Sequence, residues 1–176
     1  MTDLLERIAG RRSIRSFTDR EIEGDRIRKL IEAAIYAPSG GNIQAWNVVV
    51  LQGAGNIERI KAASPGLLGN PSALIIFCAD KRRAYELGGE LGRDTLSIMD
   101  IAIAAQNICL EATDLGLGSC MIRSFNQNAV RELLELPEAM SPELIISLGY
   151  PLDIPEPPPR RSVEDTIYYW DKVKSR

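Results

Sequence analysis

Two short segments of the chain place arginines beside a serine. They are Arg-Arg-Ser-Ile-Arg over residues 11–15 and Pro-Arg-Arg-Ser over residues 159–162. An arginine side chain presents a planar fork of donors that matches a phosphate group, and a serine hydroxyl adds a small donor next to it. The pattern therefore favours a bound anion, with phosphate as the first candidate. Either segment alone is also compatible with a solvated basic patch at a helix end.

A third segment, Pro-Ser-Gly-Gly-Asn-Ile-Gln-Ala-Trp over residues 38–46, has the composition of a ligand-binding loop. Its glycines allow the backbone to approach a ligand closely. The amides of Asn42 and Gln44 both donate and accept hydrogen bonds, which suits the edge of a heterocycle with alternating carbonyls and ring nitrogens. The alternative is a connector rich in turn formers.

The chain has no histidine, which restricts its possible chemistry. It excludes Ser-His-Asp and Cys-His triads, histidine acid–base catalysis and every metal site with an imidazole ligand. We therefore expect no metal and no catalytic side chain, and a bound organic cofactor that carries the reaction.

The composition limits which binding partners and which cellular compartment are expected. With 21 basic and 24 acidic residues the net charge is −3, so we expect no general attraction to nucleic acid or to an anionic membrane. The longest apolar stretch, residues 73–79, is far too short to span a bilayer. The three cysteines lie outside any Cys-x-x-Cys spacing and favour a reducing compartment, so we expect a cytoplasmic protein.

The length of 176 residues and the absence of repeats predict one domain, residues 1–176. Apolar periodicity and turn signals predict helices over residues 2–9, 26–36, 55–63, 93–115 and 127–136, and strands over residues 46–51, 73–79, 119–122 and 144–148. Residues 65–71 are expected to form a loop.

The predicted helix over residues 93–115 is apolar nearly all round. Its polar positions, Ser97, Asp100, Asn107, Glu111 and Asp114, follow one stripe. So wide an apolar surface must be covered on several sides, by the sheet and by a partner subunit. The alternative is a central core helix of a monomer.

The Gly-Leu-Gly-Ser segment at residues 116–119 is not a dinucleotide fingerprint. That motif needs a third glycine, a strand before it and a helix after it, whereas here the third position is Met121 and the flanking elements are reversed. Further on, four prolines between residues 153 and 161 predict a stiff, extended arm that is able to reach across a surface or to a neighbouring subunit. Apolar residues beyond it, from Val163 to Val173, call for a partner, although a disordered tail is the alternative.

Five motifs together resemble the FMN-dependent nitroreductases. They are Arg-Arg-Ser-Ile-Arg-Ser-Phe at 11–17, Ala-Pro-Ser-Gly-Gly-Asn-Ile-Gln-Ala-Trp at 37–46, Gly-Leu-Gly-Ser at 116–119, Gly-Tyr-Pro at 149–151 and Pro-Arg-Arg at 159–161. The resemblance implies an α+β sandwich with a mixed, mainly antiparallel sheet between helices. It also implies an intertwined homodimer with FMN at each of two subunit interfaces, in which residues 152–176 form an arm toward the partner.

The resemblance also assigns cofactor-binding residues. The residues expected to bind the phosphate, ribityl chain and pyrimidine edge of FMN are Arg11, Arg12, Ser13, Arg15, Arg160 and Arg161. The loop residues Pro38, Ser39, Gly40 and Asn42 are expected to line the flavin from the other protomer, and Met121, Ile122 and Arg123 to run beside the isoalloxazine ring. Arg15 is the best candidate to stabilise the negative charge of the reduced flavin.

The implied activity is an FMN-dependent oxidoreductase that takes hydride from NADH or NADPH and reduces nitroaromatic, quinone or activated enone acceptors by ping-pong kinetics. A dehalogenase or flavin-degrading enzyme on the same scaffold, or a non-catalytic flavin-binding protein, are the alternatives.

The chain departs from the family in two places. Residues 80–93 are short where larger relatives insert helices over the substrate, and Arg123-Ser124 stands where some relatives carry Glu-Gly, so a cation there would alter redox tuning or favour an anionic substrate.

Overall fold

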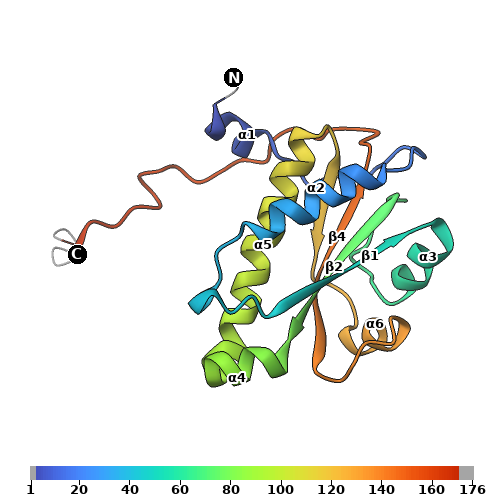
Figure 1. Cartoon of the computed structure of the whole chain (residues 1–176). Coiled ribbons are helices and arrows are strands. Elements are labelled where there is room, and N and C mark those ends of the chain that lie inside the picture. The colour runs from blue at the N-terminus through green and yellow to red at the C-terminus, as the bar shows by residue number, and fades with distance from the viewer. Residues whose placement is uncertain (1–2, 171–176) are drawn as a thin grey trace.

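A four-stranded antiparallel sheet lies between two layers of helices in the computed structural model, which describes residues 3–170 (Figure 1). The strands are β1 (Trp46–Gln52), β2 (Ala73–Asp80), β3 (Gly118–Ile122) and β4 (Met140–Gly149), in the order β1-β2-β4-β3. The predicted α+β sandwich is confirmed. Within the described residues, parallel pairing is limited to an isolated bridge between Ser13 and Ser119.

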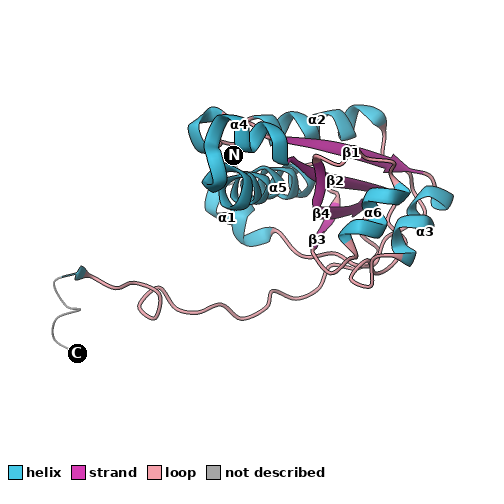
Figure 2. Ribbon diagram, turned by 90° about the horizontal axis from the view of Figure 1, so that it is seen from below, coloured by secondary structure: helices cyan, strands magenta, loops and turns pink. Residues whose placement is uncertain are grey.

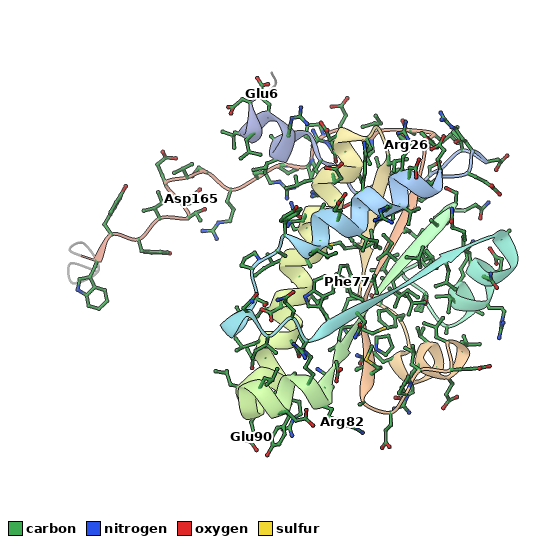
Figure 3. All side chains as sticks on the ribbon, in the orientation of Figure 1. Glu6, Arg26, Phe77, Arg82, Glu90 and Asp165 are labelled. Atoms are coloured by element: carbon green, nitrogen blue, oxygen red, sulfur yellow. The ribbon has the colours of Figure 1, made fainter. Side chains whose placement is uncertain are left out.

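The central strand β2 is buried on both faces, which explains its continuous apolar sequence. Successive side chains of a strand point to opposite faces. Ile75 and Phe77 therefore pack under α2 (Gly24–Ile35) and α5 (Ser97–Asp114), with Phe77 in the middle of the body in Figure 3. Leu74 and Ile76 pack on the opposite side, in the core under α3 (Ala54–Ala62) and α6 (Gln127–Leu133).

One helix was missed by the sequence patterns. Residues 81–91 form α4 (Lys81–Leu91), which continues through a π-helical turn, η2 (Gly92–Leu96), into α5. Two adjacent glycines, which disfavour helix, hide it in the sequence, and Gly89 leaves helical geometry with a φ of 61°. The expectation of a short connecting segment here was therefore incomplete, because the segment itself is helical.

The other predicted elements are confirmed, with shifted ends. Helix α6 ends at Leu133 rather than residue 136, because the chain turns through Glu135 with a φ of 52°. Strand β4 begins at Met140, four residues before the predicted start. Pro142 is an unusual residue inside a strand, but it lies at the irregularity where the register to β2 shifts, a position that tolerates proline.

The helical run over residues 81–114 is the only one within residues 3–170 that is long and apolar enough to cross a membrane, by length and composition. In this fold it packs on the sheet, and 44% of its most apolar window is buried inside the protein. We therefore interpret it as the core helix.

Helix α1 and the beginning of the C-terminal arm lie near the carboxyl end of α5. The short helix α1 (Leu4–Gly10) contacts α5, and Arg7 forms an ion pair with Asp114. After β4, residues 152–170 form an exposed, largely extended arm that leaves the body (Figures 1 and 2). The extended course of the arm agrees with the prediction, and its reach toward a partner subunit stays a prediction. Val173 lies outside the described residues.

Candidate functional site

The basic segment over residues 11–15 runs beside the edge strand β3. The Ile14 amide donates to the Ser119 carbonyl at 2.9 Å, and the Ile14 side chain is buried against Gly118. A Cβ on Gly118 would come within 2.7 Å of Ile14, so only glycine permits this approach. Because side chains alternate along extended chain, Arg11, Ser13 and Arg15 project on the side opposite Ile14.

The donors on this side are largely free to bind an anion. Arg11 is half-buried, yet within residues 3–170 its guanidinium forms no hydrogen bond or ion pair, and the Ser13 hydroxyl is also unpaired. Arg15 is exposed and makes only a long contact of 3.5 Å to the Ser13 carbonyl. Burial raises the pKa of the Cys109 thiol, while a hydrogen bond with Ser119 and the charge of Arg11 act against this rise. The arrangement fits a phosphate bound by two arginines and a hydroxyl.

Arg12 projects to the other side of the segment. Its NH1 donates to the Ala9 carbonyl at 2.6 Å and to the Arg11 carbonyl at 3.0 Å, so Arg12 stabilises the end of α1. It also lines a cavity of about 110 Å³ with Ile14 and Gly118, among other residues, and its buried Nε has no hydrogen-bond partner among the described residues. A contact between Arg12 and a cofactor stays a prediction.

A hydrogen-bond network just after the basic segment fixes the point at which the chain joins the sheet. The amide of Thr18 donates to the Tyr150 carbonyl at 2.9 Å, and the Tyr150 hydroxyl donates to Glu23 at 2.7 Å. That hydrogen bond, with another from Arg20, lowers the pKa of Glu23 to about 2. Arg20 also lies 3.9 Å from the Tyr150 ring centre. These contacts fix the position of the chain just after Arg15.

The loop over residues 64–70 is a further part of the candidate site, although the sequence patterns predicted residues 65–71 only as a loop. The Gly66 amide donates to the Ser124 carbonyl at 3.0 Å. Gly69 has a φ of 69° and lies so close to Arg15 that a Cβ would be 2.1 Å from the Arg15 carbonyl oxygen. Asn70 directly follows Gly69, and its Oδ1 accepts a hydrogen bond from Lys61 Nζ at 3.2 Å, so its amide NH₂ is an additional candidate for binding. The sequence signal was the glycine that precedes this asparagine.

The stretch over residues 121–123 completes the same side of the molecule. Ile122 is buried in the core beneath α3 and α6, so the 38%-exposed Met121 projects toward the opposite face. Arg123 forms an ion pair with the buried Glu143, between NH2 and Oε2 at 3.6 Å. Residues 13–15, 66–70 and 119–124 thus form one continuous candidate surface.

The loop over residues 38–42 lies elsewhere, near the beginning of α5. It contains the short 3-10 turn η1 (Gly40–Asn42), and Gly41 and Asn42 have φ values of 58° and 55°. The Gly40 amide donates to Oδ1 of the buried Asp100 at 3.1 Å, and a Cβ on Gly40 would meet Leu96 at 2.9 Å. Residues of η2 and α5 therefore hold the loop in a defined shape.

The predicted site residues consequently fall into three groups within one chain. The basic segment lies at the carboxyl end of α5 and the loop near its amino end, and the helix between Asp100 and Asp114 spans roughly 20 Å at 1.5 Å per residue. Arg160 and Arg161 lie on the exposed arm, where Arg161 bonds to the Asp165 carbonyl. A single chain does not bring these groups together.

The role of the hydrogen bond from Gly40 to Asp100 in positioning the loop can be tested by substitution. Replacing Asp100 with leucine leaves the Gly40 amide without its acceptor, and we expect the affinity for FMN to fall by about tenfold, since a hydrogen bond to a charged group contributes about 1.5–3 kcal/mol. Flavin titration measures the loss. Asp100→Asn keeps an acceptor oxygen without the charge and should lose clearly less affinity, whereas equal loss in both variants would show that the bond does not position the loop.

Comparison with known proteins identifies relatives along most of the chain. The model of the family described as "Nitroreductase family" matches residues 8–68 and 60–150. A protein of Archaeoglobus fulgidus with the provisional name NADH dehydrogenase/NAD(P)H nitroreductase is 35% identical over 87% of this chain and 88% of its own length. An FMN reductase (NADPH) of Bacillus subtilis is 30% identical over 91% and 70%. The structure of an FMN-dependent nitroreductase from Clostridium difficile superposes with a TM-score of 0.80 at 27% identity, covering 95% of this chain and 99% of the other.

Proposed function

The chain belongs to the nitroreductase family and is an FMN-dependent NAD(P)H oxidoreductase, and we propose that it reduces small nitroaromatic, quinone or activated enone acceptors as a homodimer with two FMN sites. One observation carries the placement of the cofactor. The half-buried, unpaired guanidinium of Arg11 shares a face with Ser13 and Arg15.

The residues present fit FMN rather than a dinucleotide. Arg11, Ser13 and Arg15 provide donors for one terminal phosphate. Gly69 packs closely against the Arg15 carbonyl, and the amide of the following residue, Asn70, is proposed to bind the polar edge of the ring. Met121 provides an apolar border, whereas the side chain of Ile122, also expected beside the ring, is buried in the core on the opposite face. Arg160 and Arg161 would add charge to the phosphate side once the arm is folded against a body.

Bound FMN supplies the hydride chemistry between the nicotinamide and the acceptor. The chain's own residues bind and orient it. Arg15 is the cation best placed to stabilise negative charge near the cofactor, because its exposed guanidinium keeps most of its donors free. No side chain is required as an acid or base, since solvent can deliver protons, which is compatible with the absence of histidine.

The outer surface of α5 supports the proposal of a dimer. In its first turns the polar residues Ser97 and Asp100 face inward, while Ile98, Met99 and Ile103 are 40–54% exposed. Helix α1 adds exposed Leu4 and Leu5, and a groove of about 390 Å³ runs between α1, α2 and α5. An apolar surface of this kind is typical of a subunit interface.

A two-fold axis across this surface would also complete the site. Pairing two copies of α5 in antiparallel directions places the loop over residues 38–42 of one chain near Arg11 of the other, because the two groups lie toward opposite ends of the helix. Pro38, Ser39, Gly40 and Asn42 are therefore proposed to line the flavin bound by the partner.

We propose a cytoplasmic location. All three cysteines are unpaired and buried, and burial raises the pKa of Cys78 to about 12. Buried, protonated thiols of this kind suit a reducing compartment.

The function is tested by the identity and the reduction of the chromophore. We expect FMN to be released on heating, at two per dimer by light scattering and absorbance, and the bound flavin to be bleached anaerobically by NADH or NADPH. Nitroaromatic, quinone and enone acceptors should each restore the colour. Release of FAD, or a colour that no nicotinamide bleaches, would contradict the assignment.

A further inference from the structure

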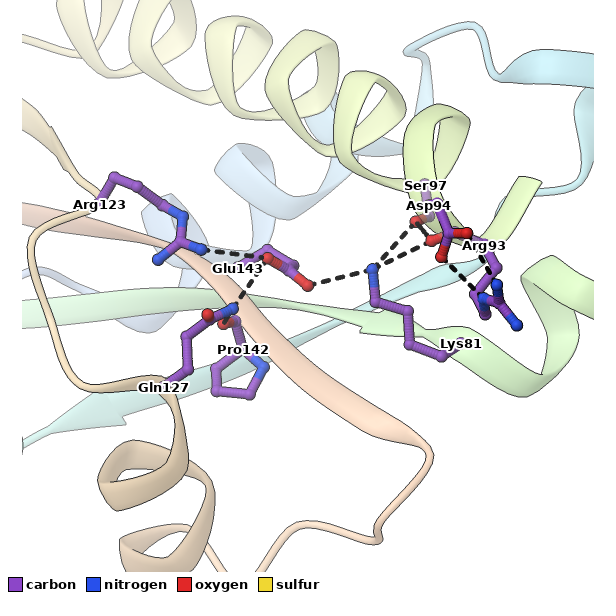
Figure 4. Close-up of polar contacts among 8 residues, drawn as sticks. All are labelled: Lys81, Arg93, Asp94, Ser97, Arg123, Gln127, Pro142 and Glu143. Atoms are coloured by element: carbon purple, nitrogen blue, oxygen red, sulfur yellow. Dashed lines mark hydrogen bonds and ion pairs between the residues drawn. The ribbon is translucent and has the colours of Figure 1, made fainter. Parts of the chain in front are cut away.

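Arg123 belongs to a buried charge network that leaves its own guanidinium facing outward. Glu143 is at the centre of this network, with its side chain only 6% exposed. Figure 4 shows Lys81 and Arg123 on opposite sides of Glu143. Lys81 approaches Oε1 at 3.2 Å, and the Gln127 amide donates to Oε2 at 3.0 Å.

The charge of Glu143 is therefore already compensated by Lys81. Lys81 is fixed further by a hydrogen bond to the Arg93 carbonyl at 3.1 Å, and only 27% of its side chain is exposed. Two cations and one carboxylate leave a net positive charge of one, and the exposed member of the network carries it. The side chain of Arg123 is 56% exposed.

The Arg123 side chain is held in place, but its N–H groups remain available to bind a ligand. Its contact with Glu143 at 3.6 Å is longer than a charge-assisted hydrogen bond, which is typically about 2.7–2.9 Å. Its guanidinium carbon lies 5.4 Å from the centre of the Phe125 ring, which supports the side chain from one side. Within residues 3–170, no hydrogen bond uses the Arg123 donors.

We infer that Arg123 is a specificity-determining residue that binds the carboxylate of an anionic acceptor. The inference rests on the proposed function, because Arg123 is the last residue of the stretch over residues 121–123 that is expected to run beside the flavin. The preferred acceptor is then an aromatic or conjugated acid. Its apolar part contacts the exposed Met121 and its carboxylate takes the free fork of Arg123, for which arginine has matching bidentate geometry.

A matched pair of acceptors tests this preference on the FMN-loaded protein. 4-Nitrobenzoate carries the anion and 4-nitrobenzamide is its neutral counterpart. For the parent, kcat/KM should favour the anion. In Arg123→Gln the ratio of the two kcat/KM values should fall by about tenfold or more, as expected for the loss of a charge-assisted hydrogen bond. Arg123→Lys should retain part of the preference, and Arg59→Gln, which removes an exposed charge from α3, should leave the ratio unchanged.

A binding measurement separates this inference from the proposed function. Titration of the oxidised, FMN-loaded protein with 4-nitrobenzoate, followed by the visible flavin spectrum or by calorimetry, needs no turnover and should show the same loss of affinity in Arg123→Gln. If NAD(P)H fails to reduce the flavin while the anion still binds through Arg123, the proposed function fails and the subsite stands. An unchanged ratio and unchanged anion affinity in Arg123→Gln would overturn the subsite. An equal loss with both acceptors, or a raised KM for the nicotinamide alone, would also overturn it.

Discussion

Mixing two inactive variants, Arg11→Glu and Asn42→Ala, is expected to restore about a quarter of the parent activity. Random exchange of subunits in a two-fold dimer makes about half of the dimers mixed, and each mixed dimer then has one intact site of two. The intact site combines Arg11 from one chain with the loop from the other. Activity and bound FMN after denaturation and joint refolding provide the two measurements.

The expected recovery follows from the separation of the two groups along α5. Arg11 lies near the carboxyl end of this helix, whereas Asn42 is held near its amino end through the bond from Gly40 to Asp100. If one chain supplied both groups to one site, every site in the mixed dimer would carry one defect and no activity would return. Refolding each variant alone is the control, and a fully active, flavin-loaded monomer would contradict the shared site.

Replacing Gly69 with alanine is expected to reduce the affinity for FMN by about 10- to 100-fold. The new Cβ would lie 2.1 Å from the Arg15 carbonyl oxygen, and the φ of 69° is itself strained for alanine. Arg15 or the loop must move, and loss of one charge-assisted contact to FMN corresponds to about 1.5–3 kcal/mol. Flavin titration with the purified variant measures the change.

A glycine in α3 provides a matched control for the Gly69 substitution. Gly55 lies in α3, and no atom comes within 4 Å of the place that a Cβ would occupy, so Gly55→Ala should keep the affinity for FMN. It should also raise the thermal midpoint slightly, because alanine favours helix by about 1 kcal/mol over glycine. Unchanged flavin binding in Gly69→Ala would show that the loop over residues 64–70 does not position the site.

Local sequence patterns were sufficient for most of the fold. The apolar run of residues 73–79 predicted β2 because a strand that is buried on both faces has no polar positions to alternate. Residue types alone also predicted an anion site in the segment 11–15, and the absence of histidine directed attention to a cofactor. These features depend on residues that are close together in the chain.

Helix α4 and strand β4 show where such patterns fail. Gly88 and Gly89 weaken the local preference for helix by about 1 kcal/mol per residue, and the chain leaves helical geometry at Gly89 before the helical run continues through η2 into α5. Pro142 is accepted in β4 because the neighbouring register shift removes the need for its missing amide.

The composition of the site was decided by tertiary structure. Alternation along the segment beside β3 places Arg11 and Arg15 on a different side from Arg12, and the close packing of Gly69 brings a loop from a distant part of the sequence against Arg15. Sequence order predicted the binding residues by type, but it carried no signal for which of them share a surface. Which residues share a surface is set by the register of the strands and by the separation of the groups along α5. Both depend on packing between residues that are far apart in the chain.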